Sequence, residues 1–156
     1  MSQKLEALGM LELSSIAVAY AVQDAMIKAA DIEVLVARTI CSGKYMIMIG
    51  GQVQAVRFSL EAGKALTKEA LIDELLIPEV DPRLFPAISA TVALKDSDKD
   101  ALGILEAFSV TAIVEGADAA VKAADVTLFR IHVAMAIGGK GYLMLTGEIS
   151  QVEAAI

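Results

Sequence analysis

The chain has 156 residues and a formal net charge of −7, so it lacks the basic surface that nucleic-acid binding requires. Hydrophobic residues make up 56% of it, yet no apolar run approaches the roughly 20 residues of a membrane span. One cysteine cannot form an internal disulfide, and the N-terminal MSQKLEAL lacks the apolar segment of a signal peptide, so we expect a cytoplasmic protein.

The first half of the chain begins with a predicted strand, a helix and a hairpin. Ala7–Leu13 alternates as a strand does, and Ser14 or Ser15 can cap a helix that runs to about Ala30. Two strands rich in β-branched or apolar residues then flank a Ser-Gly turn, which predicts a hairpin; they are Glu33–Ile40 and Tyr45–Ile49.

A second helix is predicted over Gln52–Ala62, with Gly63 as its stop, and Ala70–Ile77 reads as a closing strand. Pro78–Pro86 holds all three prolines and reads as a linker. The order β-α-β-β-α-β with a central antiparallel hairpin predicts a ferredoxin-like α+β fold, an antiparallel sheet flanked by helices.

The second half repeats the first. ALGMLEL at Ala7 returns as ALGILEA at Ala101, and DAMIKAADIEV at Asp24 returns as DAAVKAADVTL at Asp118, both at an offset of 94 (101 − 7 and 118 − 24). SGKYMIMIGGQV from position 42 returns as GGKGYLMLTGEI from position 138, at an offset of 96 (138 − 42), which indicates a two-residue insertion near residues 132–136. The pattern predicts a tandem duplication.

We therefore expect two domains, residues 1–90 with the linker and residues 91–156. By the second register Ile156 corresponds to Leu60 (156 − 96), inside the second helix of the first copy. The second domain is therefore expected to be truncated at its C-terminus and to lack a closing strand.

These repeated motifs, with a Gly-Lys turn before each Gly-ending strand, resemble bacterial microcompartment shell domains. Two such domains in one chain are similar to the tandem-domain class, whose trimers imitate hexamers. The Cys41 turn and RIHVAMAIGGKGYLMLTGEIS in the second copy most resemble the shell proteins of propanediol-utilisation compartments. Relatives commonly carry proline directly after this cysteine, whereas Ser42 follows it here.

The resemblance implies a homotrimeric tile in the shell of a cytoplasmic microcompartment. It places the hairpin turns at a pore on the symmetry axis, lined by Ser42, Gly43, Lys44, Ile137, Gly138, Gly139 and Lys140. It also places Lys28 and Lys122 at tile edges, and it implies other shell proteins and an encapsulated redox enzyme as partners.

Symmetry would bring three copies of Cys41 together, and three convergent thiolates suit a metal or an iron–sulfur cluster. We expect one [4Fe–4S] cluster per trimer, lost in aerobic preparations, that passes electrons or clusters across the shell. A zinc ion held by three thiolates and a water remains the alternative ligand.

Other interpretations stay open at this point. A lone cysteine is often a small buried hydrophobe, and His132 reads better as a packed residue than as a ligand. Lys44 and Lys140 can attract anions or simply be solvated. No nucleophile–base pair points to an enzyme. A trimeric ferredoxin-like regulator that binds a small metabolite is the alternative function.

Overall fold

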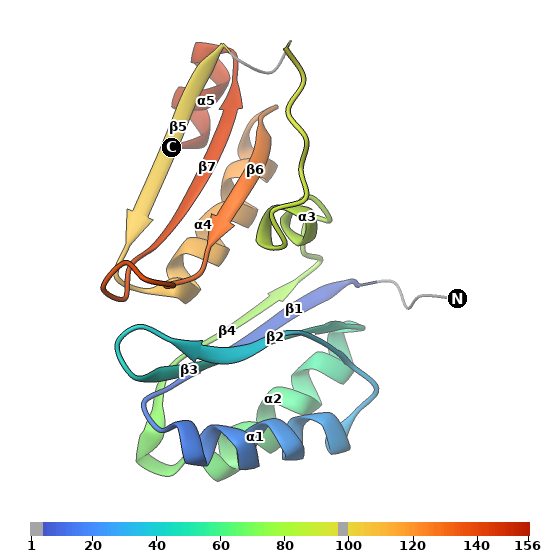
Figure 1. Cartoon of the computed structure of the whole chain (residues 1–156). Helices are drawn as coiled ribbons and strands as arrows, with labels where there is room; N and C mark the ends of the chain where they lie inside the picture. Colours follow the sequence, from blue (N-terminus) through green and yellow to red (C-terminus); the bar gives the residue numbers. More distant parts are fainter. Residues whose placement is uncertain (1–4, 97–99) are drawn as a thin grey trace. The chain divides into compact units, whose positions relative to one another are not determined.

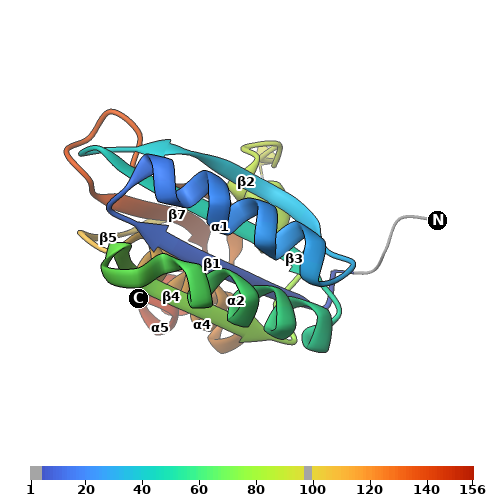
Figure 2. The same cartoon turned by 90° about the horizontal axis from the view of Figure 1, so that it is seen from below.

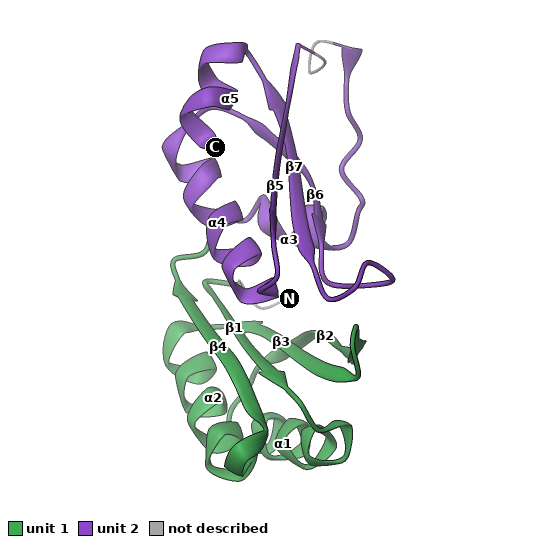
Figure 3. Cartoon of the chain, turned by 90° about the vertical axis from the view of Figure 1, so that its left-hand side faces the viewer, with its two compact units in different colours: residues 1–80 green, residues 81–156 purple. Residues whose placement is uncertain are grey.

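The structure is a computed structural model that describes residues 5–96 and 100–156 (Figure 1). The chain divides into two compact units, residues 1–80 and 81–156 (Figure 3). The segment after Val80 thus belongs to the second unit, whereas the expected division lay after residue 90. Among the described residues, no helix is both long enough and apolar enough to cross a membrane.

The first unit has the predicted β-α-β-β-α-β order. Its elements are β1 (Ala7–Leu13), α1 (Ile16–Ala29), β2 (Glu33–Ile40), β3 (Lys44–Gly51), α2 (Val53–Thr67), the 3-10 turn η1 (Lys68–Ala70) and β4 (Leu71–Pro78). The strands form one antiparallel sheet in the order β2-β3-β1-β4, and α1 and α2 lie side by side across one face (Figure 2). This arrangement confirms the ferredoxin-like α+β fold.

The helices are held on the sheet by small residues and by an apolar core. The Ser15 hydroxyl accepts a hydrogen bond from the Val18 amide and so caps α1, as the sequence predicts. Gly9 lets α2 approach β1, because a Cβ there would lie 2.6 Å from Val56. Leu11 and Leu13 project into the same core between sheet and helices.

One prediction in this unit is wrong. Gly63 does not stop the second helix, which continues to Thr67. Gly63 is buried where α2 meets α1, and a Cβ at that position would lie 2.6 Å from Met26 Cγ. Close approach of two helices, rather than a chain reversal, requires a glycine here.

The second unit repeats the layout with three described strands. Its elements are α3 (Leu84–Ile88), β5 (Ala101–Ala107), α4 (Val110–Ala123), β6 (Thr127–His132), β7 (Gly141–Gly147) and α5 (Ile149–Ala155). The antiparallel sheet has the order β5-β7-β6, which matches β1-β3-β2. The proline-rich segment is not purely a linker, because β4 ends at Pro78 and α3 follows at Leu84.

The pairing registers confirm the duplication. Ala7 pairs with Gly51 in the first unit and Ala101 pairs with Gly147 in the second, so β1 shifts by 94 residues and β3 by 96. The two extra residues therefore lie between β6 and β7, where the sequence comparison placed them.

Candidate functional site: the two hairpin turns

The cysteine lies at the tip of the hairpin between β2 and β3. Cys41 is half-buried, and Ser42 and Gly43 are exposed. Gly43 has φ of +80°, a left-handed conformation that favours glycine, and a Cβ there would meet nothing within 4 Å. The turn thus presents the only thiol of the chain beside two small exposed residues.

An ion pair anchors the base of this turn. The Lys44 ammonium at the start of β3 lies 2.6 Å from Glu12 Oε1 on β1, and only 2% of the Glu12 side chain is exposed. A carboxylate so buried needs a cationic partner, because its charge has lost most of its hydration. The charge of Lys44 is therefore offset by Glu12, and the pair ties the turn to the central strand.

The equivalent turn of the second unit is a longer loop, residues 133–140. Ile137 stands where Cys41 stands in the first unit, and it is exposed. Gly138 and Gly139 have φ of +66° and +89°, and the Lys140 amide donates to the Ile137 carbonyl at 3.4 Å. At the position of Cys41 this tip therefore offers an aliphatic side chain in place of a thiol.

The ion pair at the base is also duplicated, in a different setting. Lys140 Nζ lies 2.8 Å from Glu106 Oε1, and here 64% of the glutamate side chain is exposed. The same ammonium lies 5.2 Å from the centre of the Phe108 ring. Lys44 and Lys140 are both ion-paired, a feature that the sequence analysis missed although Glu12 and Glu106 recur at the repeat offset.

His132 packs against an aromatic ring. Its imidazole stacks on Tyr142 with ring centres 4.8 Å apart and an interplanar angle of 9°, and its Nδ1 is buried. This agrees with the interpretation as a packed residue. Within residues 5–96 and 100–156, no group of three His, Cys, Asp or Glu side chains of one chain can hold a metal ion.

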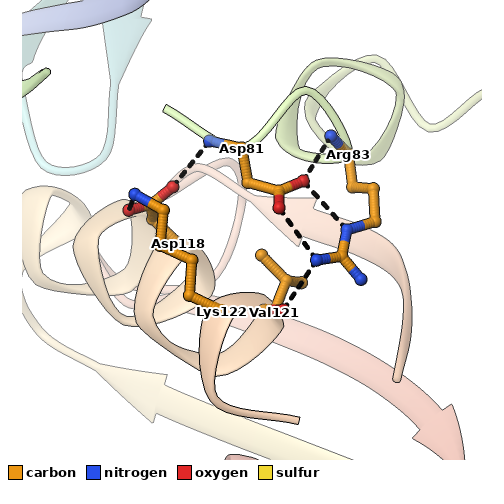
Figure 4. Close-up of polar contacts among 5 residues, drawn as sticks. All are labelled: Asp81, Arg83, Asp118, Val121 and Lys122. Carbon is orange, nitrogen blue, oxygen red and sulfur yellow. Dashed lines mark hydrogen bonds and ion pairs between the residues drawn. The ribbon is translucent and has the colours of Figure 1, made fainter. Parts of the chain in front are cut away.

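The two lysines expected at tile edges both lie in the last turn of a helix. Lys28 on α1 pairs with Asp24, and Lys122 on α4 pairs with Asp118, one helical turn earlier in each case. Around Asp118 lies a network that the sequence analysis missed (Figure 4). The amide of Asp81 donates to Asp118 at 2.8 Å.

Asp81 is in turn clamped by Arg83. Arg83 donates to Asp81 through Nε at 2.9 Å and Nη2 at 2.8 Å, and Nη2 also donates to the Val121 carbonyl at 2.6 Å. Hydrogen bonding to Arg83 lowers the pKa of Asp81, and the same bond raises the pKa of Arg83. The spacing of Asp118 and Lys122 could have suggested their ion pair, but nothing in the sequence joins residues 81 and 83 to α4.

The comparisons with known proteins agree with this geometry. The family model of the BMC domain matches residues 7–80 and 101–156. The chain belongs to the BMC-domain family. It is 44% identical over 152 residues to the bacterial microcompartment shell protein PduT of Citrobacter freundii, covering 97% of this chain and 81% of that protein.

Two further relatives extend the comparison. The chain is 29% identical over 163 residues to the carboxysome assembly protein CcmO of Synechocystis, covering 96% of this chain and 54% of that protein. It superposes on the crystal structure of a microcompartments protein from Desulfitobacterium hafniense DCB with a TM-score of 0.89 at 39% identity, covering 97% and 83% of the two chains. The family assignment makes this chain a structural component of a bacterial microcompartment shell, not an enzyme.

Proposed function

We propose that the chain forms a homotrimeric shell tile whose central pore carries one [4Fe–4S] cluster, held by three copies of Cys41. The chain is a structural shell protein of a bacterial microcompartment and associates with other shell proteins. The cluster would pass electrons, or be passed itself, across the wall to an encapsulated redox enzyme. The observation that carries the proposal is the single thiol at the tip of one hairpin turn and its absence from the equivalent tip.

Exposed apolar surfaces support the trimer. Ile16, Tyr20 and Ile27 are exposed on α1, whereas the equivalent residues of α4 are buried: Val110, Val114 and Val121. On the sheets the relation is reversed, since Leu102 and Ile104 on β5 are exposed and the equivalent residues Leu8 and Met10 are buried.

A chain with two different exposed apolar surfaces suits head-to-tail contacts between copies. A head-to-tail contact closes into a ring when its rotation allows. We infer that the exposed face of α1 in one copy covers the exposed face of β5 in the next. Three copies of a two-domain chain would give six domains around one axis.

The donor set of the turn fits a symmetric cluster site. One chain supplies one thiol, and within residues 5–96 and 100–156 no group of three His, Cys, Asp or Glu side chains of one chain could hold a metal ion. Three-fold symmetry would supply three thiols, and iron–sulfur clusters are held by cysteine thiolates, commonly four. The fourth ligand would then come from water, a free thiol or another small molecule, because Ile137 offers none. Bound in this way, a cluster supplies one-electron chemistry at the pore.

The turns themselves suit a narrow axis. Ser42 and Gly43 add little bulk beside Cys41, and the second tip has two glycines with positive φ, Gly138 and Gly139. Six such tips can converge without large side chains closing the aperture. Lys44 and Lys140 directly follow the tip glycines in sequence, and the positive charge of each is paired with a glutamate.

Anaerobic reconstitution tests the cluster. The protein is incubated with iron and sulfide, and absorption and electron paramagnetic resonance spectra are recorded together with the mass in solution. Cys41→Ser should abolish the cluster while trimers persist, and the matched variant Ile137→Ser should keep it. Iron bound equally well by Cys41→Ser would place the site elsewhere, and zinc bound by wild type in preference to a cluster would favour the zinc alternative.

The tile edges are tested separately. In this proposal Lys28 and Lys122 donate from one tile to backbone carbonyls of the next, since an ammonium group carries three hydrogen-bond donors. The double variant Lys28→Ala, Lys122→Ala should remain trimeric but form no sheets in electron micrographs. Unchanged sheets would remove the edge assignment.

A further inference from the structure

The two edge lysines occupy equivalent positions but different surroundings. Lys28 and Lys122 are related by the offset of 94, and so are their partners Asp24 and Asp118. On α1 the pair lies open to water, with 61% of the Asp24 side chain exposed. On α4 only 9% of the Asp118 side chain is exposed.

The segment Asp81–Arg83, here called the arm, gives Asp118 a second partner besides Lys122. The Asp81 amide donates a hydrogen bond to one carboxylate oxygen of Asp118, and the Lys122 ammonium donates to the other (Figure 4). Arg83 fixes the arm against α4 through its bonds to Asp81 and to the Val121 carbonyl. The Asp118 side chain is therefore held in one orientation by the arm.

The two lysines consequently differ in the free-energy cost of separating the ammonium group from its aspartate partner. If Lys28 turns toward a neighbouring tile, water solvates the exposed Asp24 carboxylate, and exposed pairs of this kind contribute little to stability. If Lys122 turns away, the buried Asp118 carboxylate keeps only one backbone amide, and an uncompensated buried charge is strongly unfavourable. Lys122 is therefore retained by its own tile.

We propose that the arm makes the two kinds of tile edge unequal: Lys28 is available to neighbouring tiles, whereas Lys122 is held back by Asp118 until the arm is released. The proposal rests on the proposed edge role of these lysines. It assigns to Asp81, Arg83 and Asp118 the positioning of Lys122 and predicts that a trimer has three strongly and three weakly associating edges.

Amine labelling of dilute, unassembled protein tests the retention of Lys122 directly. With trace acetic anhydride and peptide mass spectrometry, Lys28 should be acetylated severalfold faster than Lys122. Asp118→Asn still accepts from the Asp81 amide but no longer pairs with the ammonium, so it should raise the Lys122 rate to that of Lys28. The matched variant Asp24→Asn should change the Lys28 rate little, and Arg83→Met should raise the Lys122 rate in part.

Equal labelling of Lys28 and Lys122 in the wild type, or an unchanged Lys122 rate in Asp118→Asn, would overturn the proposal. Single variants then test its consequence in assembly. Lys28→Ala should prevent sheet formation, whereas Lys122→Ala should leave most of it. Equal loss in both singles would overturn the inequality but keep the edge role, and intact sheets in the double variant would remove the edge role itself.

Discussion

The turn between β2 and β3 and the loop between β6 and β7 occupy the same place in two copies of one domain. The first is three residues long, carries Cys41 and has a buried ion pair at its base. The second is eight residues long, carries Ile137 and has an exposed ion pair at its base. The three strands β5-β7-β6 keep the order of β1-β3-β2, so this shared part of the sheet is alike in the two copies while the tips differ. A single-domain hexamer would present six identical tips, whereas a duplicated chain can place a ligand at three of six.

The largest expected difference between the two copies is in the loss of stability when the lysine at the base of each turn is replaced. Lys44→Met leaves the Glu12 carboxylate buried without its cation and should destabilise the first unit by about 3–5 kcal/mol. Lys140→Met breaks the equivalent but exposed pair and should cost less than about 1 kcal/mol. Hydrogen exchange in urea, read for each unit separately, gives both values.

A double variant serves as the control for this prediction. Glu12→Met combined with Lys44→Met removes both charges and should recover most of the loss, because a buried ion pair is often replaceable by apolar side chains. Equal destabilisation by Lys44→Met and Lys140→Met would contradict the difference between the two bases.

Replacing a helical glycine by alanine should have a smaller effect on stability, and the effect should differ in sign between the two units. Gly63→Ala places a Cβ 2.6 Å from Met26 Cγ between α1 and α2, and it should destabilise the protein by about 1 kcal/mol after the gain in helix propensity. Gly116→Ala on α4 meets nothing within 4 Å and should stabilise by about 0.5–1 kcal/mol. Urea midpoints measure both, and stabilisation by Gly63→Ala would show that the two helices do not pack closely there.

The smallest predicted effect is a pH dependence specific to the second unit. Hydrogen bonding to Arg83 holds the pKa of Asp81 below its ordinary value of 3.8, so the native unit binds fewer protons than the unfolded chain near that value. The stability from this pair is therefore present above pH 3.8 and is lost as the pH falls through the lower, folded pKa. Asp81→Asn should lose less in melting temperature between pH 6 and pH 3 than the wild type. A loss as large as that of the wild type would count against the pair.

Much of the fold could be predicted from the sequence because the same pattern occurs in both halves of the chain. The Ser15 cap, the alternation of β1 and the glycine-ended strands recur at fixed offsets, so each copy supported the interpretation of the other. The wrong prediction at Gly63 has a physical cause. A glycine that ends a helix and a glycine that lets a neighbouring helix pack closely cannot be distinguished from the sequence alone.

The site was only partly predictable for a similar reason. The tips could be found from Cys41 and the Gly-Lys motif, because turn chemistry is local in sequence. The Glu12–Lys44 pair and the Asp81–Arg83 arm join residues 32 to 38 positions apart, and only the folded chain brings them together. Asp24 and Asp118 likewise lie in matching motifs, DAMIK and DAAVK, and only the folded chain shows that Asp118 is buried and bonded to the arm.

The central claim is that three chains share one cluster through Cys41. The most direct measurement is native mass spectrometry of the anaerobically reconstituted protein, with iron and acid-labile sulfide quantified on the same sample. The proposal predicts a trimer that carries one set of four irons and four sulfides, and Cys41→Ser trimers that carry none. One iron or zinc per chain, or a cluster retained by Cys41→Ser, would contradict it.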